Sequence, residues 1–335
     1  MVELGYMKYQ DRVYGMIEID GPVILDLIKS PSLQRMKGID QHGYFEPYFP
    51  GMTFKRFEHS IGVSILLKRF GASLKEQIAG LIHDVSHTVF SHVGDYIYGF
   101  ETNQDFQDNY FEKFVKDSEI PNILKKYGID YKYIVNEENF PLKERDLPDL
   151  CADRIDYFLR AIEITTKVHP KEINQFLNNL LIVDDFWVFK NKNLANKYAL
   201  QYLEMYNWFW SGLISAVMFK TMEALLKYAL NKKVITTDDL FTTEEKVWAK
   251  IRSAANEDSN LAHLLARADN KIKYKDSTKE DYDFYCQIKP RIVDPLFLEN
   301  KKLKRVSEID PEFFKLKEKY SKPKEYYIKF LERRN

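Results

Sequence analysis

Apolar residues along most of the chain recur at spacings of three and four positions, a pattern typical of amphipathic helices that bury one face. We expect the principal helices to open at Pro22, to begin near His59, to run from Lys75, to span about Pro148 to Ile164 and to span about Leu200 to Tyr228. The predicted core stripes are Ile78, Leu81, Ile82 and Val85 in the third helix and Leu150, Ile155, Phe158, Leu159 and Ile162 in the fourth. On the other face of the fourth helix, the spacing of Asp149, Asp153, Tyr157 and Arg160 predicts that they project together.

Three short segments depart from the helical pattern. Residues 11–20 alternate loosely, which indicates a short strand or hairpin, and an Asn-Lys-Asn turn within residues 186–198 indicates a small hairpin. A further hairpin should turn at Glu299 to Lys301 and be followed by a terminal helix. The pattern therefore predicts a mainly α fold, a helical core with short β-hairpins. We expect one domain over residues 1–270 and a small α+β C-terminal tail over residues 271–335, packed on the same core.

Composition narrows the function classes. Lys+Arg and Asp+Glu are equal at 50 each among 335 residues, so no global field draws the protein to nucleic acid or to an anionic membrane. Cys151 and Cys286 are the two cysteines, and their spacing predicts neither a disulfide framework nor a cysteine metal cluster. The N-terminus does not resemble a signal peptide, and no apolar run approaches ~18 residues. We therefore expect a cytoplasmic protein without membrane or nucleic-acid partners.

Histidines gather in one part of the sequence. Five of the seven, His42, His59, His83, His87 and His92, lie between residues 42 and 92, beside Asp84. If the third helix continues through His83 and Asp84, these neighbours lie about 100° apart and both can reach one ion. A single histidine is more often a core or surface residue, which is our interpretation of His169 and His263. The cluster instead predicts a metal site.

Three sequence blocks resemble the signatures of HD-domain phosphohydrolases. RFEHSIGVS, AGLIHDVSHTVFSH and CADRIDYFLRA are most similar to the deoxynucleoside triphosphate triphosphohydrolases and their bacterial relatives. The resemblance implies an HD core at about residues 50–165. It also implies that His59, His83, Asp84 and Asp153 hold the metal.

The expected ligand set favours certain metals. Two imidazoles and two carboxylates suit a borderline divalent ion. Four protein ligands would saturate a tetrahedral zinc, whereas an octahedral ion keeps positions for water and a phosphate oxygen. We therefore favour Mn or Fe, while Ni, Co, Zn or Mg remain compatible with the residues.

The resemblance also implies roles around the metal. His87 and His92 match histidines near the HD pair and, with Asp84, form the expected catalytic group, with His87 as proton donor or phosphate clamp. Arg56 matches an arginine that binds the substrate phosphate. Gln41 and Tyr157 match residues that contact the sugar, although a solvated loop amide and a packed aromatic remain alternatives.

Several positions depart from the triphosphohydrolase pattern. Asn103 stands where a further catalytic histidine is expected near the substrate, Ala161 replaces an acidic sugar contact, and His42 replaces a leucine. Lys220 is the only basic residue in residues 207–226, where relatives carry a cationic lining for the triphosphate. These departures favour a smaller phosphomonoester, a nucleoside monophosphate or a differently placed nucleotide.

The resulting hypothesis is a metal-dependent phosphohydrolase. It would cleave a phosphate ester or anhydride of a nucleotide or related small phosphate, by metal-activated water with histidine assistance. The alternatives are a triphosphohydrolase proper, a catalytically degenerate HD module that binds a nucleotide or a protein partner, and an HD nuclease, which the balanced charge disfavours. A homo-oligomer is compatible with the resemblance.

Overall fold

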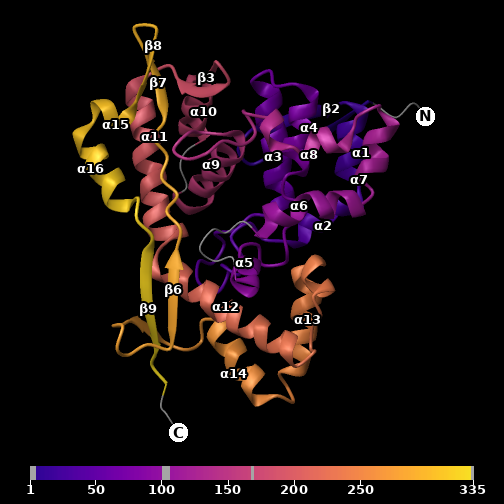
Figure 1. Ribbon diagram of the computed structural model, residues 1–335, viewed down its shortest axis with the longest axis vertical. Coiled ribbons are helices and arrows are strands. Elements are labelled where there is room, and N and C mark those ends of the chain that lie inside the picture. Colours follow the sequence, from indigo (N-terminus) through magenta and orange to yellow (C-terminus); the bar gives the residue numbers. More distant parts are fainter. Residues whose placement is uncertain (1–4, 100–105, 167–169, 333–335) are drawn as a thin grey trace.

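Helices dominate the computed structural model, which describes residues 5–99, 106–166 and 170–332 (Figure 1). The α-helices are α1 Pro22–Lys29, α2 Pro31–Arg35, α3 Arg56–Arg69, α4 Leu74–Ile82, α5 Val93–Tyr98, α6 Phe106–Asp117, α7 Ile120–Lys126, α8 Tyr131–Val135, α9 Ala152–Thr166, α10 Pro170–Asn179, α11 Lys192–Met205, α12 Leu213–Asn231, α13 Glu244–Ala254, α14 Ser259–Ala268, α15 Val306–Ile309 and α16 Pro311–Tyr320. A π-helix, Tyr206–Trp210, follows α11, and 3₁₀ turns cover Met36–Gly38, Glu137–Asn139 and Asp238–Phe241. The predicted mainly α class is confirmed.

Three small sheets complete the fold. The strands are β1 Tyr6–Asp11, β2 Gly15–Asp20, β3 Leu180–Val183, β4 Phe186–Phe189, β5 Tyr274–Asp276, β6 Phe284–Ile288, β7 Leu296–Glu299, β8 Lys302–Arg305 and β9 Lys324–Phe330. β1 and β2 form an antiparallel hairpin, so the prediction of a hairpin there is confirmed, although its first strand begins earlier. The sheet orders β3-β4-β7-β8 and β5-β9-β6 show that strands after residue 271 extend a sheet begun by β3 and β4.

The elements that carry the histidine cluster are the central ones of the N-terminal half. α3 packs against both α4 and α9. In Figure 1 the first helices lie on one side of the molecule, whereas β6, β9, α15 and α16 lie on the opposite side. In this view α9, α10 and α12 lie between the two groups, and α11 lies beside β7. No single helix of the described ranges is long and apolar enough to cross a bilayer, although Lys192–Trp210 with Leu213–Asn231, bent by 44°, passes as a pair on length and composition.

Side-chain caps account for several helix starts. Ser73 accepts a hydrogen bond from the Glu76 amide at the start of α4, and Asp310 does the same for two amides of α16. Pro22 occupies the first turn of α1, where its missing N–H costs no helical hydrogen bond.

The region of α4 corrects one expectation and confirms another. The predicted stripe of Ile78, Leu81, Ile82 and Val85 is fully buried. The helix nevertheless ends at Ile82, so the prediction that His83 and Asp84 share a helical turn is wrong. Side chains replace the missing helical hydrogen bonds: Arg35 donates to the carbonyls of Val85 and His87, and Gln107 donates to that of His83.

α9 begins at Ala152 and not at Pro148, while its predicted core stripe is buried. Asp149, Asp153, Tyr157 and Arg160 were expected to project from one face of this helix. The prediction is wrong for Asp149 and Arg160. Asp149 precedes the helix and accepts from Arg305, and Arg160 is completely buried. Asp153 and Tyr157 do lie on a common face, because both line the same polar cavity, which is described with the candidate site. Arg160 departs from the predicted face because it forms buried ion pairs with Asp11 and Asp156 inside the core.

Two hairpin predictions had different outcomes. The prediction of a hairpin turn at the Asn-Lys-Asn segment is wrong, because Asn191 instead caps the N-terminus of α11. The actual turn is Asp184–Asp185, where both residues take positive φ and join β3 to β4. The hairpin turning near Glu299 to Lys301 is confirmed by β7 and β8. The expected terminal helix is α16, but β9 follows it.

Candidate functional site

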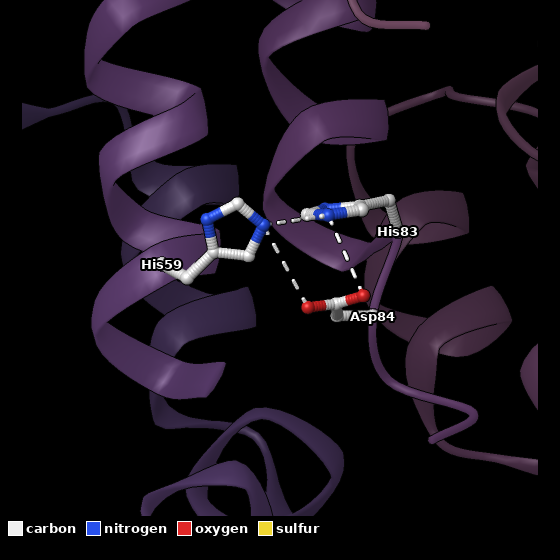
Figure 2. A group of neighbouring side chains, drawn as sticks. All are labelled: His59, His83 and Asp84. Atoms are coloured by element: carbon white, nitrogen blue, oxygen red, sulfur yellow. Dashed lines mark hydrogen bonds and ion pairs between the residues drawn. The ribbon is translucent and has the colours of Figure 1, made fainter. Parts of the chain in front are cut away.

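His59, His83 and Asp84 point toward one another between α3 and the end of α4 (Figure 2). The Nε2 atoms of the two histidines lie 3.2 Å apart. Asp84 places Oδ2 3.8 Å from Nε2 of His59 and Oδ1 3.5 Å from Nε2 of His83. One potential ligand atom from each residue lies within 4.8 Å of the others, which is a spacing that a single ion can bridge.

Asp153 joins this group from α9. Its Oδ1 lies 2.7 Å from Nε2 of His59 and 3.3 Å from Nε2 of His83. Asp153 therefore contacts both histidines, while the group whose ligand atoms all lie within 4.8 Å of one another consists of His59, His83 and Asp84. His59 and Asp84 are almost wholly buried, while Asp153 is 23% exposed and lies toward solvent.

Hydrogen bonds on the far side of each ring decide which nitrogen faces the site. Nδ1 of His83 lies 2.7 Å from the Gly80 carbonyl, which can only accept, so this nitrogen carries the hydrogen. Nδ1 of His59 lies 2.8 Å from the carboxylate of Asp156 and carries a hydrogen for the same reason. In the neutral rings both Nε2 lone pairs then face each other and the carboxylates of Asp84 and Asp153. In this tautomer the two nitrogens and the Asp153 carboxylate present lone pairs to one another, which is the arrangement that metal-binding histidines need.

The pKa shifts in the cluster arise from burial, which opposes charge, and from neighbouring charged groups, which outweigh burial. Burial lowers the pKa of His59, but its hydrogen bonds with Asp153 and Asp156 outweigh burial and raise it to about 9. Burial opposes ionisation of Asp84, yet the charge of Arg56 and the nearby histidines hold its pKa well below the usual range. The carboxylates are therefore ionised, and their negative charge favours a cation at the centre.

A buried ionic network supports His59 from behind. Asp156 is fully buried and accepts from Nε of Arg160 at 2.7 Å and from the Tyr14 hydroxyl at 2.7 Å. Arg160 also donates to Asp11 at 2.8 Å, at the end of β1. The N-terminal hairpin is thus tied through Asp156 to a candidate metal ligand. The sequence analysis missed Asp156, although its position three residues after Asp153 in DRIDYFLR was a signal.

We predict that Asp156→Asn weakens Mn²⁺ binding by about 10- to 100-fold, the usual effect of removing a carboxylate that orients a ligating histidine. The neutral amide cannot balance Arg160, so the orientation of His59 is lost. Isothermal titration with Mn²⁺ measures the change. Tyr14→Phe is the matched control, because it removes one neutral hydrogen bond and leaves the charge of Asp156, and it should cost less than Asp156→Asn. Equal affinity in Asp156→Asn and wild type would contradict the orienting role.

The residues expected to assist catalysis surround Asp84. Arg56 is buried and donates to Asp84 Oδ2 at 2.6 Å and to the Ser91 hydroxyl at 2.7 Å. His87 Nε2 lies 3.3 Å from Asp84 Oδ1, although His87 follows a turn and not a continued helix. The ring of His92 lies edge-on to that of His87, and its Nδ1 is 3.0 Å from Asp95.

Two adjoining cavities open beside the cluster. The polar cavity, about 340 Å³, is lined by His83, Asp84, Asp153 and many charged residues. The aromatic cavity, about 80 Å³, is lined by His42, Phe45, Tyr206, Trp210 and Phe219. The residues that line both are Gln41, His92, Tyr157, Lys289 and Arg291.

The remaining predicted positions are distributed as follows. Gln41 and Tyr157 face both cavities, and the Tyr157 hydroxyl bonds that of Tyr202. Asn103 lies outside the described residues. Ala161 is fully buried in the core.

The sequence analysis also missed Lys289 and Arg291. They come from the segment directly after β6, and the two basic residues flanking Pro290 in KPR were the only local signal. Because the metal ligands lie far earlier in the chain, only the folded structure relates the two regions.

Comparisons with known proteins agree with the geometry. The HD domain family matches residues 56–161, which include all four candidate ligands. YdhJ of Bacillus subtilis, an uncharacterized protein, is 34% identical over 329 residues, covering 97% of this chain and 99% of YdhJ. The metal-dependent phosphohydrolase cns2 of Cordyceps militaris is 38% identical over 173 residues, covering 51% of this chain and 49% of cns2. The crystal structure of a phosphohydrolase from Bacteroides thetaiotaomicron has a similar fold, with a TM-score of 0.75 at 18% identity over 98% of this chain and 100% of that one.

Proposed function

The chain belongs to the HD-domain family of metal-dependent phosphohydrolases, and we propose that it hydrolyses a phosphate ester or anhydride of a nucleotide or a related small phosphate. One observation carries the proposal. The Nε2 atoms of His59 and His83 lie 3.2 Å apart, with a carboxylate oxygen of Asp153 2.7 Å and 3.3 Å from them and one of Asp84 3.5 Å from His83, and such a group of nitrogen and oxygen ligands suits a divalent cation. The polar cavity beside them gives a phosphate access to that cation.

We assign different roles to the residues around the polar cavity. His59, His83, Asp84 and Asp153 would hold a divalent ion, for which Mn or Fe suits the donor set. When bound, such an ion lowers the pKa of water from ~15.7 towards ~7 and neutralises phosphoryl charge. Burial and the charge of Arg56 lower the pKa of His87 to about 3, so its neutral ring, beside Asp84, is suited to hold a phosphate oxygen by a hydrogen bond and not to protonate the leaving group. Arg56 holds Asp84 in place and adds positive charge next to the reacting phosphate.

Metal removal tests this function. The purified protein should contain a divalent metal, and phosphate release from a panel of nucleotides with Mn²⁺ should fall to background after treatment with EDTA. Added Mn²⁺ should restore it. Separating orthophosphate, pyrophosphate and tripolyphosphate identifies the bond cleaved and so decides whether the protein is a triphosphohydrolase proper. A metal-free protein that releases nothing from any nucleotide would favour the degenerate binding module instead.

A further inference from the structure

A helix distant in sequence from the metal ligands contacts the surroundings of the polar cavity through one buried carboxyl group. Glu244 is the first residue of α13 and is 7% exposed. Its Oε1 atom accepts hydrogen bonds from the backbone amide of Asp40, at 2.9 Å, and from that of Phe90, at 3.1 Å. One oxygen atom therefore joins the loop before α3 to the turn that follows the HD pair.

The turn that Glu244 contacts has a strained backbone. Phe90 and Ser91 take positive φ values of 60° and 51°, a region that residues other than glycine rarely adopt. Such conformations persist only where the surrounding structure holds them. The bond from the Phe90 amide to Glu244 does so, together with one from the Val89 amide to the Leu240 carbonyl at 2.8 Å. Residues 240–244 thus stabilise the turn.

The start of α13 also packs closely beside the residues before α3. A β-carbon added at Gly38 would lie 2.6 Å from the Thr243 side chain, so the two segments approach each other as nearly as glycine allows. Arg35 donates to the Thr242 carbonyl at 3.3 Å. Packing and hydrogen bonds therefore fix residues 242–244 in place, and Glu244 with them.

The two loops that are joined in this way surround Arg56, which is 1% exposed and lines the polar cavity. Nε of Arg56 donates to the Ser91 hydroxyl at 2.7 Å, and this hydroxyl donates to the Asp40 carbonyl. Nη2 donates to the Gln41 carbonyl at 3.3 Å, and Nη1 donates to Asp84 at 2.6 Å. The positions of the two loops therefore set the orientation of the guanidinium toward Asp84.

We propose that Glu244 is a positioning residue for Arg56, because by joining the two loops it orients the guanidinium that holds Asp84 and lies next to the substrate phosphate. The inference rests on the proposed function and adds to it a residue outside 56–161, the range that matches the HD domain family. Burial and the neighbouring Asp40 raise the pKa of Glu244 to about 8. The side chain therefore acts mainly in its neutral form at pH 7, and a glutamine should replace it.

Orthophosphate binding to the Mn²⁺-saturated protein, measured by isothermal titration, tests this role without requiring turnover. Glu244→Met removes the acceptor and should weaken orthophosphate binding by about tenfold, the loss expected for one charge-assisted contact. Glu244→Gln keeps an acceptor oxygen and should stay within about twofold of wild type. Glu245→Met, the same change at the exposed neighbouring residue, is the matched control and should bind as wild type does.

A double-mutant cycle with Arg56→Lys separates positioning from general damage to the fold. Lysine keeps the charge but cannot contact Ser91 and Asp84 at once. Adding Glu244→Met to Arg56→Lys should therefore weaken binding by less than about twofold further, whereas general damage would cost the same in both backgrounds. If Glu244→Met does not fold, Glu244→Asp takes its place with the same expectation, because a side chain shorter by one methylene cannot reach both amides.

The outcomes separate this inference from the proposed function. A wild type that binds no orthophosphate, a Glu244→Gln variant that loses as much as Glu244→Met, or an undiminished loss in the Arg56→Lys background would overturn the inference. If the wild type hydrolyses nucleotides and Glu244→Met keeps its orthophosphate affinity, the inference fails while the function stands. If the variants bind orthophosphate as expected but no nucleotide is hydrolysed, the positioning role stands and the hydrolase proposal fails.

Discussion

Asp84→Ala should lower phosphate release by about a thousandfold or more, since the bound metal supplies several kcal/mol of transition-state stabilisation in such sites. Both carboxylate oxygens of Asp84 face the imidazoles of His59 and His83, so its removal opens one side of the cluster. Metal content and single-substrate turnover with Mn²⁺ measure the two consequences. Both should fall together.

The same substitution should also destabilise the fold. Arg56 is 1% exposed and donates to Asp84, so alanine would leave a buried guanidinium without its counter-charge. Breaking a buried pair on one side costs about 3–5 kcal/mol. Asp84→Asn, which keeps the shape of the side chain, therefore accompanies Asp84→Ala in both measurements.

Asp108→Asn is the matched control within the polar cavity. Asp108 lines this cavity but does not belong to the ligand cluster, and burial raises its pKa to about 7. Its amide variant should keep the metal. A properly folded Asp84→Asn protein that retains full metal content and turnover would exclude Asp84 as a ligand.

The sequence predicted the candidate ligands and the helices that carry two of them by different routes. The resemblance to HD-domain phosphohydrolases identified the candidate ligands, and the apolar spacing separately predicted that His59 and Asp153 lie on helices, where the structure has them. The prediction that the helix continues through His83 and Asp84 failed, because Arg35 and Gln107, which are distant in sequence, donate to the carbonyls that follow Ile82. The local sequence around His83 cannot predict hydrogen bonds from residues so far away in the chain.

The supporting residues were hidden for a related reason. Asp156 resembles any helix carboxylate until the fold places Arg160, Tyr14 and His59 around it. Likewise, Arg291 becomes part of the site only because the tail returns to α9. Long-range packing, and not residue type, gives these side chains their roles.

Gly62→Ala should reduce the free energy of unfolding by about 2–4 kcal/mol and weaken Mn²⁺ binding at the same time. Gly62 faces the Asp156–Arg160 pair, and a β-carbon there would overlap both the carboxylate and the guanidinium. Disrupting a buried pair costs about 3–5 kcal/mol, while alanine gains only about 1 kcal/mol over glycine in a helix interior, so the loss prevails. Urea unfolding and Mn²⁺ titration measure the two effects.

Ser64→Ala provides the comparison for Gly62→Ala on the same helix. Ser64 is also buried but lines a different cavity, beside the β1–β2 hairpin, so its variant should lose less than about 1 kcal/mol and keep the metal affinity. The pair of variants separates general damage to α3 from damage to the network behind His59. Wild-type stability and metal affinity in Gly62→Ala would mean that Asp156 and Arg160 can shift freely, and the rigid support inferred for His59 would then be wrong.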